Sequence, residues 1–497
     1  WRKIPDNAIL NVKLGGSLSI EPSTEAFKLS YTNQMLKIDS LHDLISLLQW
    51  GAYDPRIRGI MIDLHSLSCG YAKLIEVKRW LDLFRQSGKP IIGYAEIANE
   101  KELYLSTGFS EFYIPPEGSV DIRGFSTLST FYRGLFNKIG IEPQIQRIGK
   151  YKSFGDILNC TNITQPHREV LSAVLTSISV HWANTIARRS NCSVEEIMML
   201  WNETKLLSLS DYVRRGLVTG VRYRDQVEGR LQEVLSSGSS SRGTSMHPPS
   251  RIIQHIITYM KCASALQGLP VREVTSGPRI AIINAVGMIS TGLSTETGLM
   301  GAVIGTDSLA AQLAVAREDR SIQAVVLRID SPGGSALASD ILWREIRRVS
   351  RVKPIVASMV DIAASGGYYL AMACDEIVAE RQTLTGSIGV VSAKFNTEQL
   401  RQTLGLHTEA VSIGRYAEVQ ATHRGFTAEE ARHFEDSASR AYRSFVEKAA
   451  LSRGLPVAAM EEAAQGRVWT GQQALQRGLV DHIGGLGKAL QVAQLLS

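Results

Sequence analysis

The chain has 497 residues, which at roughly 100 to 200 residues per domain predicts two to four domains. Hydrophobic residues make up 44% and charged residues 21% of the sequence, and these ordinary values exclude wholesale disorder, a collagen-like rod and a coiled coil. The net charge of +6 comes from 54 basic and 48 acidic residues spread along the chain, so it gives no reason to expect a nucleic-acid partner.

The cysteines and the apolar segments narrow the class of protein further. The five cysteines are odd in number and form no Cys-x-x-Cys pair, so neither a disulfide framework nor a metal site is expected, and no pattern indicates a cofactor. The longest apolar stretches, such as residues 252–260, are shorter than the about 20 apolar residues that cross a bilayer as a helix. No membrane-spanning helix is therefore expected, although a chain that starts at Trp1 is compatible with a signal, anchor or transit segment upstream.

The sequence contains an internal repeat. Three pairs of segments match: residues 57–66 with 322–331, 96–105 with 361–370, and Gly118-Ser119 with Gly386-Ser387. Such self-similarity predicts a duplicated domain. We expect one copy at residues 1–235 and the other at 279–497. Residues 236–278 begin with a Ser/Gly/Pro-rich stretch that is typical of a flexible linker, followed by a predicted short helix at 251–266.

In the second copy, short apolar runs alternate with longer helical patterns. Strands are predicted at residues 280–284, 324–329, 354–357 and 376–379. Helices are predicted at residues 309–317, 336–349 and 366–374, and a long helix at 427–453 is expected to pack outside the core. Alternating strands and helices favour parallel strands joined by right-handed crossovers, and hence an α/β layered fold with peripheral helices.

The two copies differ at positions that can carry chemistry. Ser365 of the second copy aligns with Glu100 of the first, and the Gly-Gly pair after Ser365 aligns with Lys101-Glu102. Conversely, Lys152 of the first copy aligns with Ala417 of the second. Each copy therefore lacks a reactive group that the other has.

Ser365 has the surroundings of a nucleophile. It lies between an alanine and a glycine at the start of a predicted helix, where small neighbours leave room for a substrate and free N–H groups face developing negative charge. The loop at residues 330–335 follows a predicted strand, and its Gly333-Gly334 pair would let backbone N–H groups approach a ligand, as in an oxyanion hole. The first copy has Leu67-Ser-Cys-Gly70 at this loop, so the hole is degraded there.

A nucleophilic serine needs a base. The chain has neither a Gly-x-Ser-x-Gly nor a His-Glu-x-x-His motif, and none of its 10 histidines lies in the two small-residue loops. Lysine serves as a base when burial lowers its pKa, and Lys152 is the lysine that is replaced in the copy with the serine. We therefore expect a dyad of Ser365 and Lys152, assembled from both copies.

The motifs around these residues closely resemble those of the signal peptide peptidase A family, also called protease IV, in its long form with tandem domains. Five segments carry the resemblance, which extends over nearly the whole chain: residues 147–153, 330–334, 363–368, 384–389 and 466–471. By this resemblance the nucleophile falls on Ser365, the general base on Lys152, and a serine that orients the lysine on Ser387. The oxyanion-hole donors fall on the backbone of Gly366 and of Gly334, with Gly333 as the alternative to Gly334.

The resemblance also implies a fold and a setting. The family has the crotonase/Clp protease-like fold, cleaves peptide bonds in membrane-derived signal peptide remnants, and forms homo-oligomers, which are tetramers in the long bacterial form. The segments at residues 147–153, 343–346 and 363–369 look most like the chloroplast version, which is associated with thylakoid membranes. The expectation is a serine endopeptidase of the chloroplast with peripheral membrane association; a bacterial inner-membrane protease whose upstream anchor was removed is the alternative.

Other interpretations compete with the dyad. A lone serine beside glycine is usually a turn or helix cap and a lone lysine a solvated charge, but the reciprocal loss between the copies favours catalysis. Ser387 is a weaker candidate, because Gly118-Ser119 keeps the same pair in the copy without a nucleophile. A crotonase-type acyl-CoA hydratase or isomerase would use carboxylates as acid and base. That enzyme and a non-catalytic scaffold are the alternatives to the protease.

Overall fold

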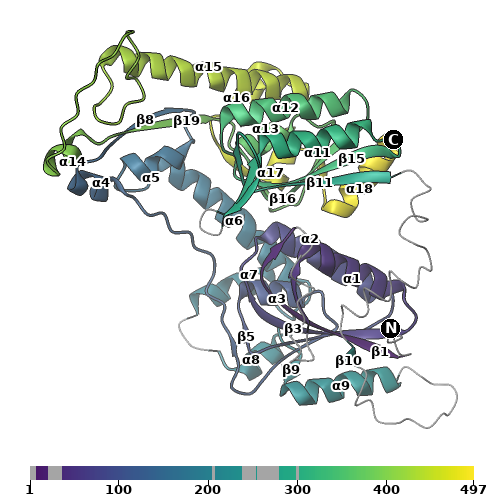
Figure 1. The fold of residues 1–497 in the computed structure, drawn as a ribbon. Coiled ribbons are helices and arrows are strands. Elements are labelled where there is room, and N and C mark those ends of the chain that lie inside the picture. Colours follow the sequence, from purple (N-terminus) through teal and green to yellow (C-terminus); the bar gives the residue numbers. More distant parts are fainter. Residues whose placement is uncertain (1–6, 21–35, 204–206, 238–252, 255–278, 298–300) are drawn as a thin grey trace. The chain divides into compact units, whose positions relative to one another are not determined.

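The computed structural model describes residues 7–20, 36–203, 207–237, 253–254, 279–297 and 301–497. Contacts divide the chain into two compact units (Figure 1): unit 1 comprises residues 1–125 and 178–278, and unit 2 comprises residues 126–177 and 279–497. Segment 126–177 carries Lys152. The repeat assigns this segment to the N-terminal domain, whereas its contacts assign it to unit 2. The repeat boundaries themselves stay a prediction, because they describe homology rather than packing.

Unit 1 is built on a parallel seven-stranded sheet. Its strand order is β10 (Ile253–Gln254), β1 (Ala8–Ser19), β3 (Ile57–Leu67), β4 (Ile91–Ala95), β6 (Glu111–Ile114) and β9 (Gly220–Val221), with β2 (Leu36–Ser40) beside β1. The helix predicted at residues 251–266 is wrong at Ile253–Gln254, which pair with β1 as a strand. The rest of that prediction lies outside the described residues.

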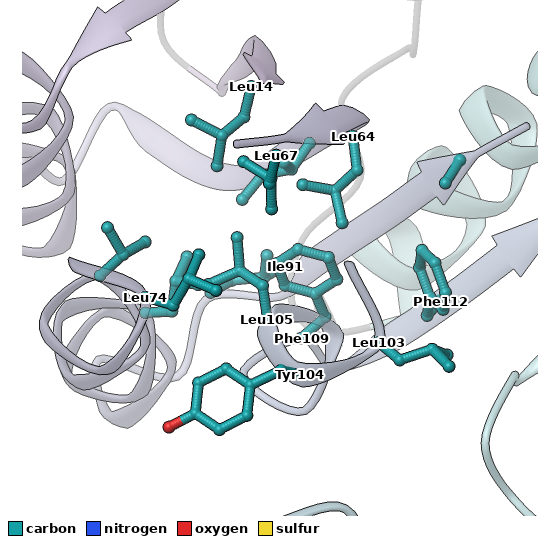
Figure 2. Packing of buried hydrophobic residues seen from close by; sticks show 14 of the residues in the cluster. Leu14, Leu64, Leu67, Leu74, Ile91, Leu103, Tyr104, Leu105, Phe109 and Phe112 are labelled. Atoms are coloured by element: carbon teal, nitrogen blue, oxygen red, sulfur yellow. The ribbon is translucent and has the colours of Figure 1, made fainter. Parts of the chain in front are cut away.

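Helices cover both faces of this sheet. The main core lies on the side of α1 (Leu41–Tyr53), α2 (Tyr71–Gln86) and α3 (Glu100–Ser106), and a smaller cluster involves α9 (Arg224–Ser237). Figure 2 shows Leu64 and Leu67 of β3 in this core, together with Leu74 of α2 and Leu103 of α3. Because both faces are covered, β3 is apolar along most of its length instead of alternating, as parallel strands usually are.

Unit 2 has a second seven-stranded sheet, which is parallel except where β18 (Leu384–Gly386) pairs antiparallel with β20 (Val468–Thr470). Its strand order is β11 (Arg279–Val286), β15 (Ile322–Ser331), β16 (Ile355–Ala364), β17 (Glu376–Ala379) and β21 (His482–Ile483); β18 also pairs with the end of β16. A small sheet of β12 (Met288–Ser290), β14 (Gly301–Gly305) and β13 (Thr295–Thr297) accompanies it. The four strands predicted for the second copy are confirmed, and three of them are longer than predicted.

The helices predicted for the second copy are also confirmed. They are α11 (Thr306–Glu318), α12 (Ala336–Ser350), α13 (Gly366–Ala371) and α15 (Ala428–Arg453). Thr427 and Glu430 form a capping box at the start of α15, and Gly454 ends it in the left-handed conformation. The prediction that α15 packs outside the core is wrong, because its Phe445 and Val446 are buried in the core of unit 2.

Segment 126–177 joins unit 2 through a strand pair. Strand β8 (Glu142–Ile148) pairs antiparallel with β19 (Val390–Asn396), in a register that sets Ile148 opposite Val390. Figure 1 shows β8 and β19 side by side, and α15 contacts both. A 3-10 turn at Ser153–Gly155 and helix α5 (Asp156–Asn159) follow β8. This strand pair places residues just after Ile148 beside the carboxyl end of β16.

Helix α6 (Gln165–Ala187) is the one helix of the described residues that is long and apolar enough to cross a membrane by length and composition. The expectation that no stretch of the sequence reaches this length overlooked it, because polar residues interrupt the apolar ones. A core helix of a soluble protein passes the same test, so the finding identifies a segment and nothing more.

Candidate active site

Ser365 stands where β16 ends and α13 begins. Its backbone has φ +55° and ψ −117°, a conformation that a residue with a side chain adopts only under strain. Two hydrogen bonds hold it there: its N–H donates to the carbonyl of Gly386 (2.8 Å), and its carbonyl accepts from the N–H of Tyr369 (2.9 Å). Ser365 is partly exposed at this turn, at the end of the strand.

The glycine loop after β15 lies against Ser365. Gly333 has φ +104°, and a Cβ on it would lie 2.6 Å from the nitrogen of Gly366. A Cβ on Gly334 would lie 2.1 Å from the carbonyl oxygen of Ile289, so neither position accepts a side chain. The N–H of Gly333 donates to Ser331 Oγ (3.2 Å). The Gly333 N–H is therefore already engaged, which favours Gly334 over Gly333 as a donor to a ligand.

Lys152 lies beside Ser365 in unit 2, within one chain. Its Nζ is 3.0 Å from Ser365 Oγ, 3.0 Å from Ser387 Oγ and 2.9 Å from the carbonyl oxygen of Ser387. The side chain is only 6% exposed. Burial lowers the pKa of Lys152 from 10.5 to about 8, with no contribution from a charged partner. The structure thus brings together the three side chains that the sequence singled out.

The strand register identifies the true counterpart of Ser387 in unit 1. In unit 2, Ala363 of β16 pairs with Thr385 of β18. In unit 1, the matching Ala98 of β5 (Ile97–Ala98) pairs with Val120 of β7 (Ser119–Val120). Thr385 and Val120 are therefore equivalent positions.

This register corrects the sequence alignment. Two residues beyond the equivalent pair, Ser387 corresponds to Ile122, so the match of Gly118-Ser119 with Gly386-Ser387 is wrong. The alignment had been shifted by three residues in this loop, which matched two dipeptides of the same sequence that are not equivalent in the structure. Because unit 1 lacks this serine as well as the nucleophile, the reason for treating Ser387 as a mere turn residue no longer holds.

A pocket of about 390 Å³ opens beside Ser365 and Lys152. Residues of α12, α13, α15 and β19 line most of it, and its lining includes Ala336, Tyr369, Val391, Ala438 and Phe445. No Asp or Glu belongs to the described lining residues, in agreement with a lysine whose pKa responds to burial alone. The site combines a hydroxyl, a buried amine, two glycine backbones and an apolar pocket.

Sequence reasoning missed the contribution of α15 to this pocket. Phe434, Ala438, Ala441 and Phe445 of this helix all line it. Their spacing of three and four residues places them on one face of the helix. That periodicity was the available signal, but the many charged residues of α15 gave it the pattern of a peripheral helix.

Known proteins match this chain along nearly its full length. The model of peptidase family S49 matches residues 83–237 and again residues 347–497. The chain is 38% identical over 496 residues to "Serine protease SPPA, chloroplastic" of Arabidopsis thaliana, covering 99% of this chain and 70% of that protein. It is 29% identical over 468 residues to "Protease 4" of Haemophilus influenzae, covering 92% and 73%, and 27% identical over 478 residues to "Protease 4" of Salmonella typhi, covering 93% and 74%.

A hydroxyl beside a buried amine, with a glycine loop and a pocket next to it, is the arrangement expected of a hydrolase of the serine type. The chain belongs to peptidase family S49, and it is a serine-type peptidase. The duplicated match of the family model confirms the duplication. Membership also decides against the acyl-CoA hydratase and the non-catalytic scaffold, and it makes peptides the class of substrate.

Proposed function

We propose that Ser365 and Lys152 form the catalytic dyad of a serine endopeptidase. Neutral Lys152 takes the proton of the Ser365 hydroxyl while Oγ attacks the carbonyl carbon of the scissile bond. The negatively charged oxygen that results accepts hydrogen bonds from the N–H groups of Gly334 and Gly366. When the C–N bond breaks, the Lys152 ammonium gives its proton to the leaving amine, and an acyl-enzyme remains on Ser365.

Water then completes the cycle. Neutral Lys152 removes a proton from a water molecule as its oxygen attacks the ester carbonyl, and the ammonium returns the proton to Ser365 Oγ when the ester bond breaks. The hydroxyl and the carbonyl oxygen of Ser387 accept hydrogen bonds from Lys152 and orient its Nζ toward Ser365. Ser387 thus keeps the Lys152 amine directed at Ser365 during both acylation and deacylation.

One observation carries this proposal: the Nζ of a buried lysine lies 3.0 Å from the hydroxyl of a strained serine. An amine with a pKa of about 8 is partly neutral near neutral pH, so it can act as a base. Burial without a carboxylate partner is the physical cause, since a nearby negative charge would raise the pKa again.

The substrates, assembly and location are part of the same proposal. Similarity to a serine protease described as chloroplastic supports a chloroplast protein, and the family resemblance supports signal peptide remnants or membrane-associated proteins as substrates. The same resemblance supports a crotonase/Clp protease-like core, a homotetramer and peripheral association with thylakoid membranes.

Two measurements test this proposal: hydrolysis of a fluorogenic peptide, and covalent labelling by a reagent that acylates a reactive serine. Ser365→Ala should abolish both turnover and labelling, with the melting temperature unchanged. Glu100→Ala, at the equivalent position of unit 1, is the matched control and should keep both. Retained turnover in Ser365→Ala would disprove the assignment of the nucleophile.

A further inference from the structure

A strained turn lies between the two loops of the dyad. Gln465 and Gly466 follow α16 (Val457–Ala463), and both have positive φ, +52° and +73°. Glycine adopts such angles freely, whereas glutamine does so at a cost. A residue that tolerates this strain has contacts that hold it in place.

On one side, the turn is bonded to the loop that carries Lys152. The carbonyl of Gln465 accepts the N–H of Tyr151 (2.7 Å), and its side-chain Oε1 accepts the N–H of Lys150 (3.2 Å). Gly466 packs directly on Lys152, because a Cβ at Gly466 would lie 2.5 Å from the Cβ of Lys152. The turn therefore fixes the backbone on which the lysine stands.

On the other side, the same turn is bonded to the loop that carries Ser387. The N–H of Gly466 donates to the carbonyl of Ile388 (2.7 Å), and the carbonyl of Arg467 accepts the N–H of Ser387 (2.7 Å). Three consecutive residues thus bridge the two loops. Their length sets the separation between Lys152 and the oxygens that orient it.

The amide of Gln465 is itself oriented by two side-chain partners, Glu461 and Tyr442. Its Nε2 donates to Glu461 Oε1, which also accepts the hydroxyl of Tyr442 (2.7 Å). The N–H of Gln465 donates to the same Tyr442 hydroxyl (3.3 Å). Because the NH₂ end of the amide faces a carboxylate, its oxygen end must face Lys150. Glutamine satisfies both ends at once, whereas a carboxylate at this position would face Glu461.

We propose that Gln465 is a positioning residue for the dyad, which clamps the Lys152 loop against the Ser387 loop and keeps the Lys152 amine buried. This proposal rests on the role of Lys152 as general base. Loosening the clamp admits water to the amine and lets the lysine leave Ser365. Water favours the charged form of the lysine, so the clamp sets the pH range of the reaction as well as its rate.

Gln465→Gly is the decisive variant. It removes the side-chain bonds and also relieves the backbone strain at φ +52°, so it should fold normally. We expect kcat to fall about tenfold, KM to stay within about twofold, and the midpoint of the kcat pH profile to rise by about half a unit or more. Gln465→Glu should shift the midpoint the same way, because it sets a carboxylate against Glu461. Gln476→Ala, an exposed glutamine nearby, is the matched control.

Two results would overturn the proposal. One is a pH midpoint that is unchanged in both variants, as it would be if activity fell equally at every pH. The other is unfolding of both variants, which would make the contacts purely structural. A parallel measurement on Lys152→Met separates this proposal from the dyad itself. If Lys152→Met keeps its turnover, the general base is wrong; if it loses turnover while the Gln465 variants behave as the parent does, only the clamp is wrong.

Discussion

The two units have different kinds of residue at equivalent positions: small residues in unit 2 and charged residues in unit 1. At the end of the strand in unit 2 stand Ser365 and two glycines; in unit 1 stand Glu100, Lys101 and Glu102. Both acids there are engaged by backbone: Glu100 Oε1 accepts the N–H groups of Arg123 and Gly124 at 2.6 and 2.7 Å. In unit 1, these backbone N–H groups are thus paired with a carboxylate of the chain itself.

The second acid of unit 1 binds the loop that corresponds to the glycine loop of unit 2. Buried Glu102 accepts the N–H of Leu67 (2.7 Å) and the N–H of Asn99 (3.0 Å). Leu67 corresponds to Pro332, which has no N–H, in the glycine loop of unit 2. A buried carboxylate that accepts two backbone N–H groups stabilises this loop in unit 1.

The pocket shows the same contrast. Ala336 lines the pocket of unit 2, while the corresponding Tyr71 of unit 1 is buried and packs edge-on against Tyr104 and Phe125, with ring centroids 5.6 and 5.7 Å away. Aromatic rings fill in unit 1 the space that is empty in unit 2. When one copy of a duplicated domain provides the active site, the other copy can fill the equivalent cavity with packed side chains.

The largest expected effect is that of removing the amine of Lys152, which belongs to unit 2 and has no counterpart in unit 1. Lys152→Met should lower kcat/KM by about a thousandfold or more, since the serine loses its base. The same variant should be more stable at pH 7, by up to about 3 kcal/mol, because a pKa of about 8 instead of 10.5 makes the buried charge costly. Peptide hydrolysis and chemical denaturation measure the two effects.

The pH dependence of this stability gain is a further check on its cause. The pKa of Lys152 is lower in the folded than in the unfolded chain, so the unfolded chain binds more protons between about pH 8 and 10.5. Across that window the parent gains stability as the pH rises. The advantage of Lys152→Met should therefore shrink toward pH 10.5; an advantage that is constant with pH would mean that packing, not charge, is its origin.

Copying the aromatic filling of unit 1 into unit 2 should close the pocket. Ala336→Tyr is expected to lower kcat/KM roughly ten- to a hundredfold for peptides with a large side chain before the scissile bond, since the ring occupies the space for it. Leu337→Tyr, next to it and 65% exposed, is the control and should leave hydrolysis unchanged. Equal losses for small and large side chains would show that this pocket does not receive that residue.

The rate of hydrolysis should also depend on pH. With a lysine base whose pKa is about 8, kcat/KM should rise about tenfold per pH unit below pH 8 and level off above it. If a carboxylate were the base instead, the midpoint would lie near the pKa of about 4 that carboxyl groups have in model peptides. A pH profile of peptide hydrolysis between pH 5 and 10 distinguishes the two.

The smallest effect should come from unit 1 itself. Glu102→Gln replaces one acceptor oxygen by a donor, which leaves a buried N–H unpaired and should cost about 1 to 3 kcal/mol of stability. Activity below the melting temperature should stay within about twofold of the parent. Exposed Glu117→Gln is the matched control in thermal denaturation, and a loss of turnover in Glu102→Gln without unfolding would show that unit 1 takes part in the chemistry.

The sequence predicted the dyad because the two copies could be read against each other. Ser365 and Lys152 stood out as reciprocal losses, and the strands and helices followed from their periodicity. The sequence could not predict the features that depend on contacts between residues far apart in the chain. Long-range contacts such as the pairing of β8 with β19 show that segment 126–177 belongs to unit 2. The strand register shows that Ser387 corresponds to Ile122.

The pairing of β8 with β19 has a consequence for synthesis. β19 leaves the ribosome roughly 250 residues after β8, which at about 5 to 20 residues per second is a delay of about 12 to 50 seconds. Until then β8 has no partner strand. Pro143 and three polar or charged residues around Ile145 make pairing with another chain unfavourable during this time. A nascent chain that ends before residue 365 therefore holds Lys152 without the hydroxyl that lies beside it in the folded chain.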